Sequence, residues 1–324
     1  MKRAGQWMLV VVALVALAAP WLAPNPPDRR FPGSLYAPPS TVRLFDGGPR
    51  APFIYPQRLV SPLERRFEED TSRPVSLRWF TDSRLVTVPE AGGGPLLLLG
   101  ADSLGRDTFS RLVYSARTSL ALALVSTLAA LFVGALVGGA AGYAGGGIDH
   151  VLSRFTDFVL VLPAIYVALA LRAAMPLVLP AATVFLVLTA IFALLGWPVV
   201  ARGVRAIVAS EREREYVVAG RALGATPWRL LGRHLLPATA GYLAAQATLL
   251  LPAFIMAEAT LSYVGLGFPD TVPTWGTMLQ DAANVSLLVD APWMLAPAAA
   301  IFIVVLAVNL VVQGTGRTPV QLEP

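Results

Sequence analysis

Six long stretches with almost no charged side chains dominate the sequence and limit what the chain can fold into. A helix needs about 20 apolar residues to cross the hydrocarbon core of a bilayer. Lipid cannot satisfy free backbone amides, so each stretch has to be helical. We therefore predict an all-α polytopic membrane protein with six transmembrane helices. They cover Met8–Ala23, the window between Arg117 and Asp149, Phe155–Leu171, the window between Arg172 and Arg202, a stretch from His234 to about Ala257, and about Ala291–Val312.

The composition supports a membrane protein and excludes several other classes. Only 14% of the 324 residues are charged, whereas soluble domains carry about 25%. With no cysteine and two histidines, no thiol chemistry, metal site or cofactor is expected. The single lysine, Lys2, follows no glycine-rich turn, so the chain is not itself a P-loop ATPase. The arginines lie in two blocks between apolar runs, so nucleic acid is not an expected partner.

The distribution of arginine predicts the orientation in the membrane. Residues 202–234 hold seven arginines, whereas no lysine or arginine lies between Leu235 and Gly316. Short cytoplasmic loops carry the excess of positive charge, so 202–234 is predicted to be cytoplasmic and 259–290 to lie outside. Counting spans then places both termini in the cytoplasm. A cleaved signal peptide is an alternative for the first stretch; we favour an uncleaved span.

The long connection 24–116 is predicted to lie outside the membrane, because long loops translocate regardless of their charge. Four of its segments are short, β-branched or aromatic, and separated by Pro, Gly and Asp, which is typical of strands. These segments are Thr41–Phe45, Pro52–Val60, Pro74–Phe80 and Arg84–Val88. We predict a small extracytoplasmic β-rich insert between the first two membrane helices. An ordered loop that only caps the helices is the alternative.

The cytoplasmic connection has the pattern of a helix, a turn and a second helix. Glutamates at 211, 213 and 215 suit the positive end of a helix, and Gly224 is placed to end it. Thr226 and Pro227 then fit a cap and a first helical position, followed by a predicted helix over Trp228–Leu236. The pattern alone leaves two roles open, an amphipathic helix on the membrane surface and a docking helix for a cytoplasmic partner.

Three motifs in the chain carry a resemblance to a known family. They are residues 99–117, then Val218-Ala219-Gly220 with Gly224 and Leu235-Leu236-Pro237, then residues 258–267 with Trp275-Gly276 and Ala291-Pro292-Trp293. The first resembles a signature that precedes the second span, and the third resembles the connection from the fifth span to the sixth. The second is similar to the EAA loop, with Val218 in place of the usual Glu. Together the motifs resemble the permease subunits of ABC importers for peptides and nickel, the OppC/DppC-like family.

The resemblance implies a type I ABC importer permease fold and a division of labour. This chain and a paralogous permease subunit would form the pathway, two ABC ATPase subunits would hydrolyse ATP, and an extracytoplasmic substrate-binding protein would deliver peptides across the bacterial plasma membrane. The chain would thus be a transport subunit without catalytic residues. The helix around Arg214–Leu223 would be the coupling helix, whose interface and hinge residues are Glu215, Ala219, Gly220, Arg221 and Gly224.

Other residues are candidates for packing or gating. Gly134, Gly138, Gly142 and Gly146 recur every fourth residue and predict close helix packing, within the chain or against the partner permease. Asp157 and Glu258 are ionisable residues near the ends of spans, for which we favour structural or gating roles over proton coupling. Arg106 and Asp107 are expected to form a local ion pair. Trp275 and Trp293 fit anchors at the membrane interface.

The resulting domain division is an N-terminal transmembrane helix (1–23), the extracytoplasmic insert (24–116), a permease domain of five helices (117–312) with a coupling loop (202–237), and a cytoplasmic tail (313–324). Two rival functions remain open. An ion-coupled secondary transporter or channel would need no ATPase. A membrane-anchored enzyme or signalling protein would use 24–116 as its active domain, although neither histidine lies there.

Overall fold

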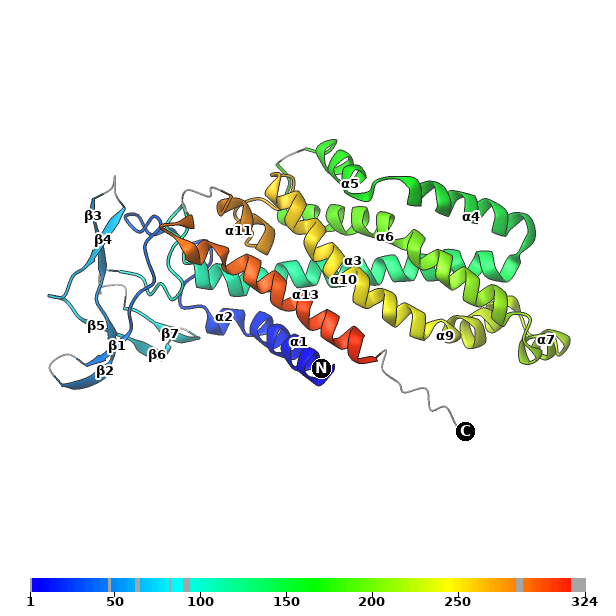
Figure 1. The fold of residues 1–324 in the computed structure, drawn as a ribbon, viewed down its shortest axis with the longest axis horizontal. Coiled ribbons are helices and arrows are strands. Elements are labelled where there is room, and N and C mark those ends of the chain that lie inside the picture. Colours follow the sequence, from blue (N-terminus) through cyan, green and yellow to red (C-terminus); the bar gives the residue numbers. More distant parts are fainter. Residues whose placement is uncertain are drawn as a thin grey trace. The chain divides into compact units, whose positions relative to one another are not determined.

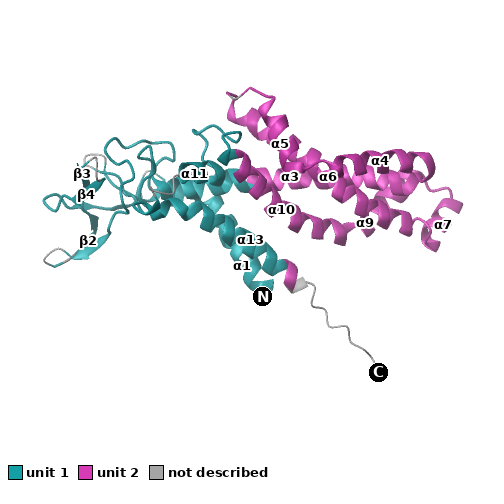
Figure 2. Cartoon of the chain, turned by 45° about the horizontal axis from the view of Figure 1, so that its top comes forward, with its two compact units in different colours: residues 1–120, 262–311 teal, residues 121–261, 312–324 magenta. Residues whose placement is uncertain are grey.

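The computed structural model describes residues 2–45, 48–61, 65–81, 83–89, 94–176, 178–283 and 288–315. The chain divides into two compact units, one of residues 1–120 and 262–311 and the other of residues 121–261 and 312–324 (Figure 2). Most of the predicted cytoplasmic tail, from residue 316 onward, lies outside the described residues.

The first unit begins with two helices, α1 (Lys2–Leu17) and α2 (Ala19–Leu22). Helix α1 packs closely on the last helix, α13 (Ala296–Thr315), because a Cβ at Gly5 would lie only 2.5 Å from the Ala307 carbonyl oxygen. The 16 residues of α1 are fewer than the roughly 20 that a span needs. The first predicted span, Met8–Ala23, is therefore divided between α1 and α2.

Seven short strands follow α2 (Figure 1). They form three small antiparallel sheets in the orders β1-β2-β5, β3-β4 and β6-β7, and buried Ile54, Leu77, Val86 and Leu96 pack together among them. The predicted strand Pro52–Val60 is interrupted at Tyr55-Pro56, where proline has no N–H for a ladder. The strands are β1 (Arg43–Phe45), β2 (Pro49–Ile54), β3 (Gln57–Ser61), β4 (Arg66–Glu69), β5 (Val75–Ser76), β6 (Arg78–Thr81) and β7 (Arg84–Thr87).

The rest of the first unit is helical and includes the start of α3 (Thr108–Ala144), α11 (Trp275–Asp281) and η3 (Pro292–Leu295). Thr274 caps α11, its side chain accepting a hydrogen bond from the backbone N–H of Thr277. Trp275 is buried, and its backbone N–H donates to Ser119 on α3. The prediction of an interfacial anchor at Trp275 is therefore wrong, because the side chain is used to pack α11 against α3.

The second unit contains the rest of α3, then α4 (Gly146–Val161), α5 (Ala164–Ala173), α6 (Ala181–Glu211) and most of α10 (Ala240–Tyr263). The predicted span Phe155–Leu171 is not one continuous helix, because α4 and α5 meet at an 83° bend. Pro163 explains the bend, since a proline disfavours the helical conformation of the residue before it. Leu162 is accordingly extended, with φ −69° and ψ 130°.

Within the described residues, four helices are long and apolar enough to cross a membrane, or five if the bent α4–α5 pair counts as one span. The four are α3, α6, α10 and the η3–α13 segment over residues 292–313. The chain is therefore a mostly helical, multi-pass membrane protein. The sixth span remains a prediction that depends on α1, which is too short to qualify on length.

Candidate functional site

The predicted coupling helix is α7 (Glu215–Ala222), which follows α6 after a turn of three residues. Glu215 lies in its first turn, whereas Glu211 is the last residue of α6. On the inner face of α7, Val217 is completely buried against Val200, Val204 and Val208 of α6. The helix is thus fixed to the C-terminal half of α6 by an apolar contact and is not a loose loop.

Gly224 ends α7 as the sequence predicts. Its φ is +80°, a left-handed conformation that favours glycine. The Gly224 N–H donates to the Arg221 carbonyl over 2.9 Å, and the Ala225 N–H donates to the Gly220 carbonyl over 3.0 Å. This pair of hydrogen bonds is the Schellman motif. It satisfies carbonyls at the end of α7 and turns the chain sharply back.

The returning segment is more irregular than the predicted helix Trp228–Leu236. It consists of α8 (Pro227–Leu230), a π-helical turn η2 (Leu231–Leu235) and α9 (Leu236–Ala238). Pro237 cannot donate to the carbonyl four residues earlier, and the wider π turn before it accommodates the ring. Leu230 and Leu235 are buried in the same apolar cluster as Val217. The two arms therefore share one core.

The outer side of this hairpin exposes large apolar side chains. Leu223 and Trp228 are 89% and 82% exposed, and Tyr216 and Val218 are about half exposed. Trp228 is thus on the surface, although its sequence position allowed either face. We call Tyr216, Val218, Leu223 and Trp228 the apolar tip. Exposed apolar side chains grouped on one short hairpin are typical of surfaces that contact proteins or membranes.

Arginines fasten the base of the hairpin to neighbouring helices. Arg212 donates to the Gly142 carbonyl near the end of α3 over 3.0 Å, where a cation suits the negative helix end. Arg205 makes a two-bond ion pair with Asp149 of α4, in which Nη2 and Oδ2 are 2.6 Å apart. The guanidinium of Arg221 lies 5.2 Å from the ring centroid of Tyr143. Three of the arginines that predicted the orientation are therefore also structural.

The other predicted coupling residues lie at the surface or the turn. Glu215 and Ala219 are exposed, and Gly220 is half-buried, with a Cβ there meeting Leu230 at 3.1 Å. The Tyr216 hydroxyl donates to Glu211 over 2.8 Å, and this hydrogen bond to a carboxylate raises the pKa of Tyr216 above its ordinary value. Val218, which replaces a glutamate of the family pattern, is exposed and supplies no carboxylate.

The glycines of α3 face α6. A Cβ at Gly134 would lie 2.8 Å from the Trp197 carbonyl oxygen, and one at Gly142 would lie 2.7 Å from the Arg205 carbonyl oxygen. Gly138 sits directly against the backbone of Ala201. Gly146 does not belong to this ladder, because α3 ends at Ala144 and Gly146 opens α4. The closest approach of α3 to α6 thus requires three glycines.

The two predicted gating acids have different surroundings. Asp157 on α4 forms a 2.6 Å ion pair with Arg202 on α6, and both side chains are more than half exposed. Glu258 on α10 is 1% exposed. One predicted gating acid is therefore exposed and ion-paired, and the other is buried.

A buried charge network in the first unit was missed by sequence reasoning. Arg106 does not pair with Asp107. It instead contacts Asp102 at 2.6 Å, Asp270 at 2.8 Å and Asp281 at 3.0 Å. Arg111 lies 3.5 Å from Asp102 and is also buried. Asp102 is only four residues from Arg106, but Asp270 and Asp281 are 164 and 175 residues away, so no local pattern could have identified these two.

These buried groups have shifted pKa values. Burial lowers the pKa of Arg106, but its carboxylate partners outweigh burial and raise it above the ordinary value. Burial raises the pKa of Asp107 to about 6, although Ser110 and Asn25 donate hydrogen bonds to it. Burial also raises the pKa of Asp281 to about 6. The network joins the start of α3 to α11 and to the connection before it.

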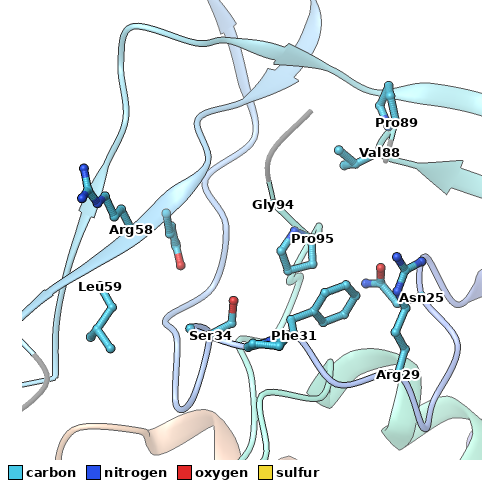
Figure 3. Close-up of a pocket in the computed structure, with 13 residues that line it drawn as sticks. Asn25, Arg29, Phe31, Ser34, Arg58, Leu59, Val88, Pro89, Gly94 and Pro95 are labelled. Atoms are coloured by element: carbon cyan, nitrogen blue, oxygen red, sulfur yellow. The ribbon is translucent and has the colours of Figure 1, made fainter. Parts of the chain in front are cut away.

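A pocket of about 460 Å³ lies in the first unit. Figure 3 shows Asn25 and Arg29 on one side of it and Arg58 and Leu59 on the other. The Asn25 amide donates to Leu96 and Asp107, so this residue has a structural role. None of the residues predicted to be functional lines this pocket.

Comparisons with known proteins agree with the resemblance seen in the sequence. Residues 130–317 match the family described as binding-protein-dependent transport system inner membrane component. The oligopeptide transport system permease OppC of Lactococcus lactis subsp. cremoris is 35% identical over 65% of this chain and 70% of its own length. The dipeptide transport system permease DppC of Alkalihalophilus pseudofirmus is 36% identical over 66% of this chain and 68% of its own length.

A chain of the inward-facing MetNI methionine ABC transporter was also found. It aligns with 64% of this chain and 98% of its own length, with a TM-score of 0.47 and 19% identity. The family match covers more than half of the chain. The chain therefore belongs to the family of binding-protein-dependent transport system inner membrane components.

Proposed function

We propose that the chain is the permease subunit of an ATP-driven ABC importer that moves oligo- or dipeptides across the bacterial plasma membrane. It would form half of the translocation pathway. The observation that carries the proposal is the apolar tip, which lies on a hairpin whose base is buried against α6. Two relatives named as oligopeptide and dipeptide permeases support peptides as the cargo.

We propose six spans in the type I importer arrangement. They are α1 with α2, α3, the α4–α5 pair, α6, α10 and α13. The N- and C-termini would lie in the cytoplasm with the 202–237 loop, and the strand region within 24–116 would lie outside. The arginine asymmetry supports this orientation.

The proposed partners follow from this orientation. A paralogous OppB/DppB-like permease would complete the pathway, and two ABC ATPase subunits would bind on the cytoplasmic side. An extracytoplasmic substrate-binding protein would dock on the outer side. The family description, which names a binding-protein-dependent transport system, supports the last of these.

Coupling would begin at the apolar tip. An ATPase cleft would hold α7 through Leu223 and Trp228, with Glu215, Ala219 and Gly220 at the contact. Because Val217 is buried against α6 and α6 is packed on α3 through the glycines, movement of α7 would displace α6 and α3 together. ATP binding can bias the inward-open and outward-open states only through its different affinity for them.

Arg221 and Gly224 would act within the hairpin. Arg221 would hold α7 against Tyr143 of α3, and Gly224 would fix the turn that presents Leu223. Asp157 and Glu258 remain proposed gating positions. The Asp157–Arg202 pair joins α4 to α6 and could break when these helices separate.

The variant Gly224→Arg tests the proposal. It places a charged side chain in the left-handed turn next to the apolar tip, so ATPase stimulation in the reconstituted complex should be lost while membrane insertion is retained. Gly224→Ala is the matched control, because it adds the backbone strain without bulk or charge and should retain partial stimulation. Full stimulation in Gly224→Arg would refute the coupling role. Uptake by the chain alone, driven by an ion gradient without nucleotide, would favour a secondary transporter.

A further inference from the structure

The β6–β7 hairpin exposes two successive aromatic side chains. Trp79 is 49% exposed and Phe80 is 73% exposed. The two aromatic residues lie on β6. Strand β7 fixes the hairpin to the protein, because its Val86 is buried with Ile54 and Leu96. Phe80 has a φ of +53°, which a bulky residue rarely adopts. This conformation disturbs the usual alternation of a strand, and both aromatic rings remain outside the core.

The hairpin is attached to the end of the first membrane segment. The Arg84 guanidinium donates to the Pro24 carbonyl over 2.8 Å, directly after α2. The rings of Trp21 on α2 and Phe80 on β6 have centroids 6.3 Å apart. Figure 1 shows β7 beside α2, and the two elements are in contact. Trp21, which is 44% exposed, therefore extends the same aromatic surface.

The first membrane segment is short for a bilayer. Its apolar part, Trp7–Leu22, would span about 24 Å as a helix, against a hydrocarbon core of about 30 Å. Trp7 is 69% exposed at the opposite end. Tryptophan and tyrosine gather at both membrane–water interfaces, where their amphipathic rings suit the headgroup level. Trp7 and Trp21 therefore suit the two interfaces, but the segment between them is shorter than the hydrocarbon core.

We propose that Trp79 and Phe80 insert into the outer lipid–water interface beside Trp21, so that the β6–β7 hairpin is a membrane anchor. This inference rests on the proposed topology, in which α1 crosses the membrane and the strands lie outside. The occupant of the aromatic surface is the lipid bilayer at the boundary of headgroups and acyl chains. The hairpin supplies the apolar depth that the short segment lacks, and the exposed Arg78 lies where lipid phosphates gather.

The absence of cysteine makes a direct test simple. Phe80→Cys and Trp79→Cys are each labelled with a nitroxide in the full-length chain, purified with the subunits that accompany it. The protein is reconstituted in vesicles of phosphatidylethanolamine and phosphatidylglycerol. The ratio of oxygen to nickel-chelate collisions reports the depth of each label. Val60→Cys on β3, which is 52% exposed, is the matched control for a strand residue in water.

The labels at 79 and 80 should show a collision ratio several-fold above that at 60. A ratio equal to that at 60 would overturn the inference, and so would labels shielded from both reagents, which indicate a covering protein. Val11→Cys on α1 distinguishes a failure of the proposed anchor from a failure of the proposed membrane span. If it reports acyl depth while 79 and 80 report water, only the anchor is wrong. If it reports water, the span and the anchor both fail.

A second measurement avoids cysteine substitution at the hairpin. Brominated lipids quench tryptophan fluorescence at short range, and the unsubstituted chain is compared with Trp79→Phe. The variant should lose part of the quenchable signal. An unchanged quenchable signal would place Trp79 away from lipid and overturn the inference.

Discussion

Replacing Gly138 by alanine tests how closely α3 and α6 must approach. The new Cβ would lie 2.9 Å from the Ala201 Cα and closer still to its carbonyl oxygen. Carbon atoms normally pack at about 3.5–4.0 Å, so the two helices would have to separate by roughly 1 Å. Overpacking of this kind costs about 1–3 kcal/mol. Since backbone atoms cannot rotate away, the upper part of this range is expected.

Gly139→Ala is the matched control for this prediction. Both substitutions bring the same gain in helix propensity, but a Cβ at Gly139 meets only side-chain ends, that of Leu236 at 3.1 Å and that of Leu231 at 3.6 Å. The difference between the two variants therefore isolates the contact with α6. At about 2–4 °C per kcal/mol for a unit of this size, a cost of about 2–3 kcal/mol should make Gly138→Ala melt about 4–12 °C below Gly139→Ala in detergent. Equal melting temperatures would refute the close-packing argument.

Three further predictions concern the apolar tip and the buried charges. Trp228→Ala should weaken ATPase binding by about 30-fold or more, because exposed aromatics at an interface contribute about 2 kcal/mol or more; a pull-down of the complex measures this. Arg106→Ala should lower the stability of the first unit by about 3 kcal/mol, because it removes the closest cation of three buried or half-buried carboxylates, and Arg111 remains near only Asp102 and Asp270; thermal unfolding measures it. Asp107→Asn should reduce the pH dependence of stability. The folded-state pKa of Asp107 is raised from 3.8 to about 6, so its contribution of up to about 3 kcal/mol is present at low pH and is lost as pH rises through 6.

Each of these predictions has its own control. Val289→Ala, at an 83% exposed position outside the hairpin, should leave ATPase binding unchanged. Arg106→Lys should recover only part of the stability, since an ammonium lacks the fork that reaches three carboxylates. For Asp107, unfolding is followed between pH 5 and pH 7. A wild-type protein that becomes less stable as pH falls through this range would contradict the assigned sign.

The hairpin shows how far local sequence reasoning extends. Gly224 was predicted to end a helix, and its φ of +80° and the Schellman hydrogen bonds agree with this. The π turn before Pro237 was not predicted, although the proline was the available signal, because the conformation before a proline also depends on how Leu230 and Leu235 fit the apolar cluster. The exposure of Trp228 could not be predicted either. A tryptophan in an amphipathic segment can face the core or a partner, and only the packed neighbours decide.

The membrane segments also combine features that the sequence predicts with features that it does not predict. Hydropathy identified the regions of α3, α6, α10 and α13, since each helix satisfies its own backbone in lipid. It did not predict the 83° bend at Pro163, although a proline in an apolar run was the available signal. It also could not show that α1 has only 16 residues, because helix ends depend on the contacts that follow them.

The sequence by itself determined the class of protein, the family, the apolar segments and the helix–turn–helix hairpin, because hydropathy and a helix-ending glycine act over a few residues. Only the tertiary structure decided which charges meet. Arg106 reaches Asp270 and Asp281 across more than 160 residues instead of its neighbour Asp107. A buried charge takes whichever partners the fold places within reach, since leaving it unpaired away from water is too costly.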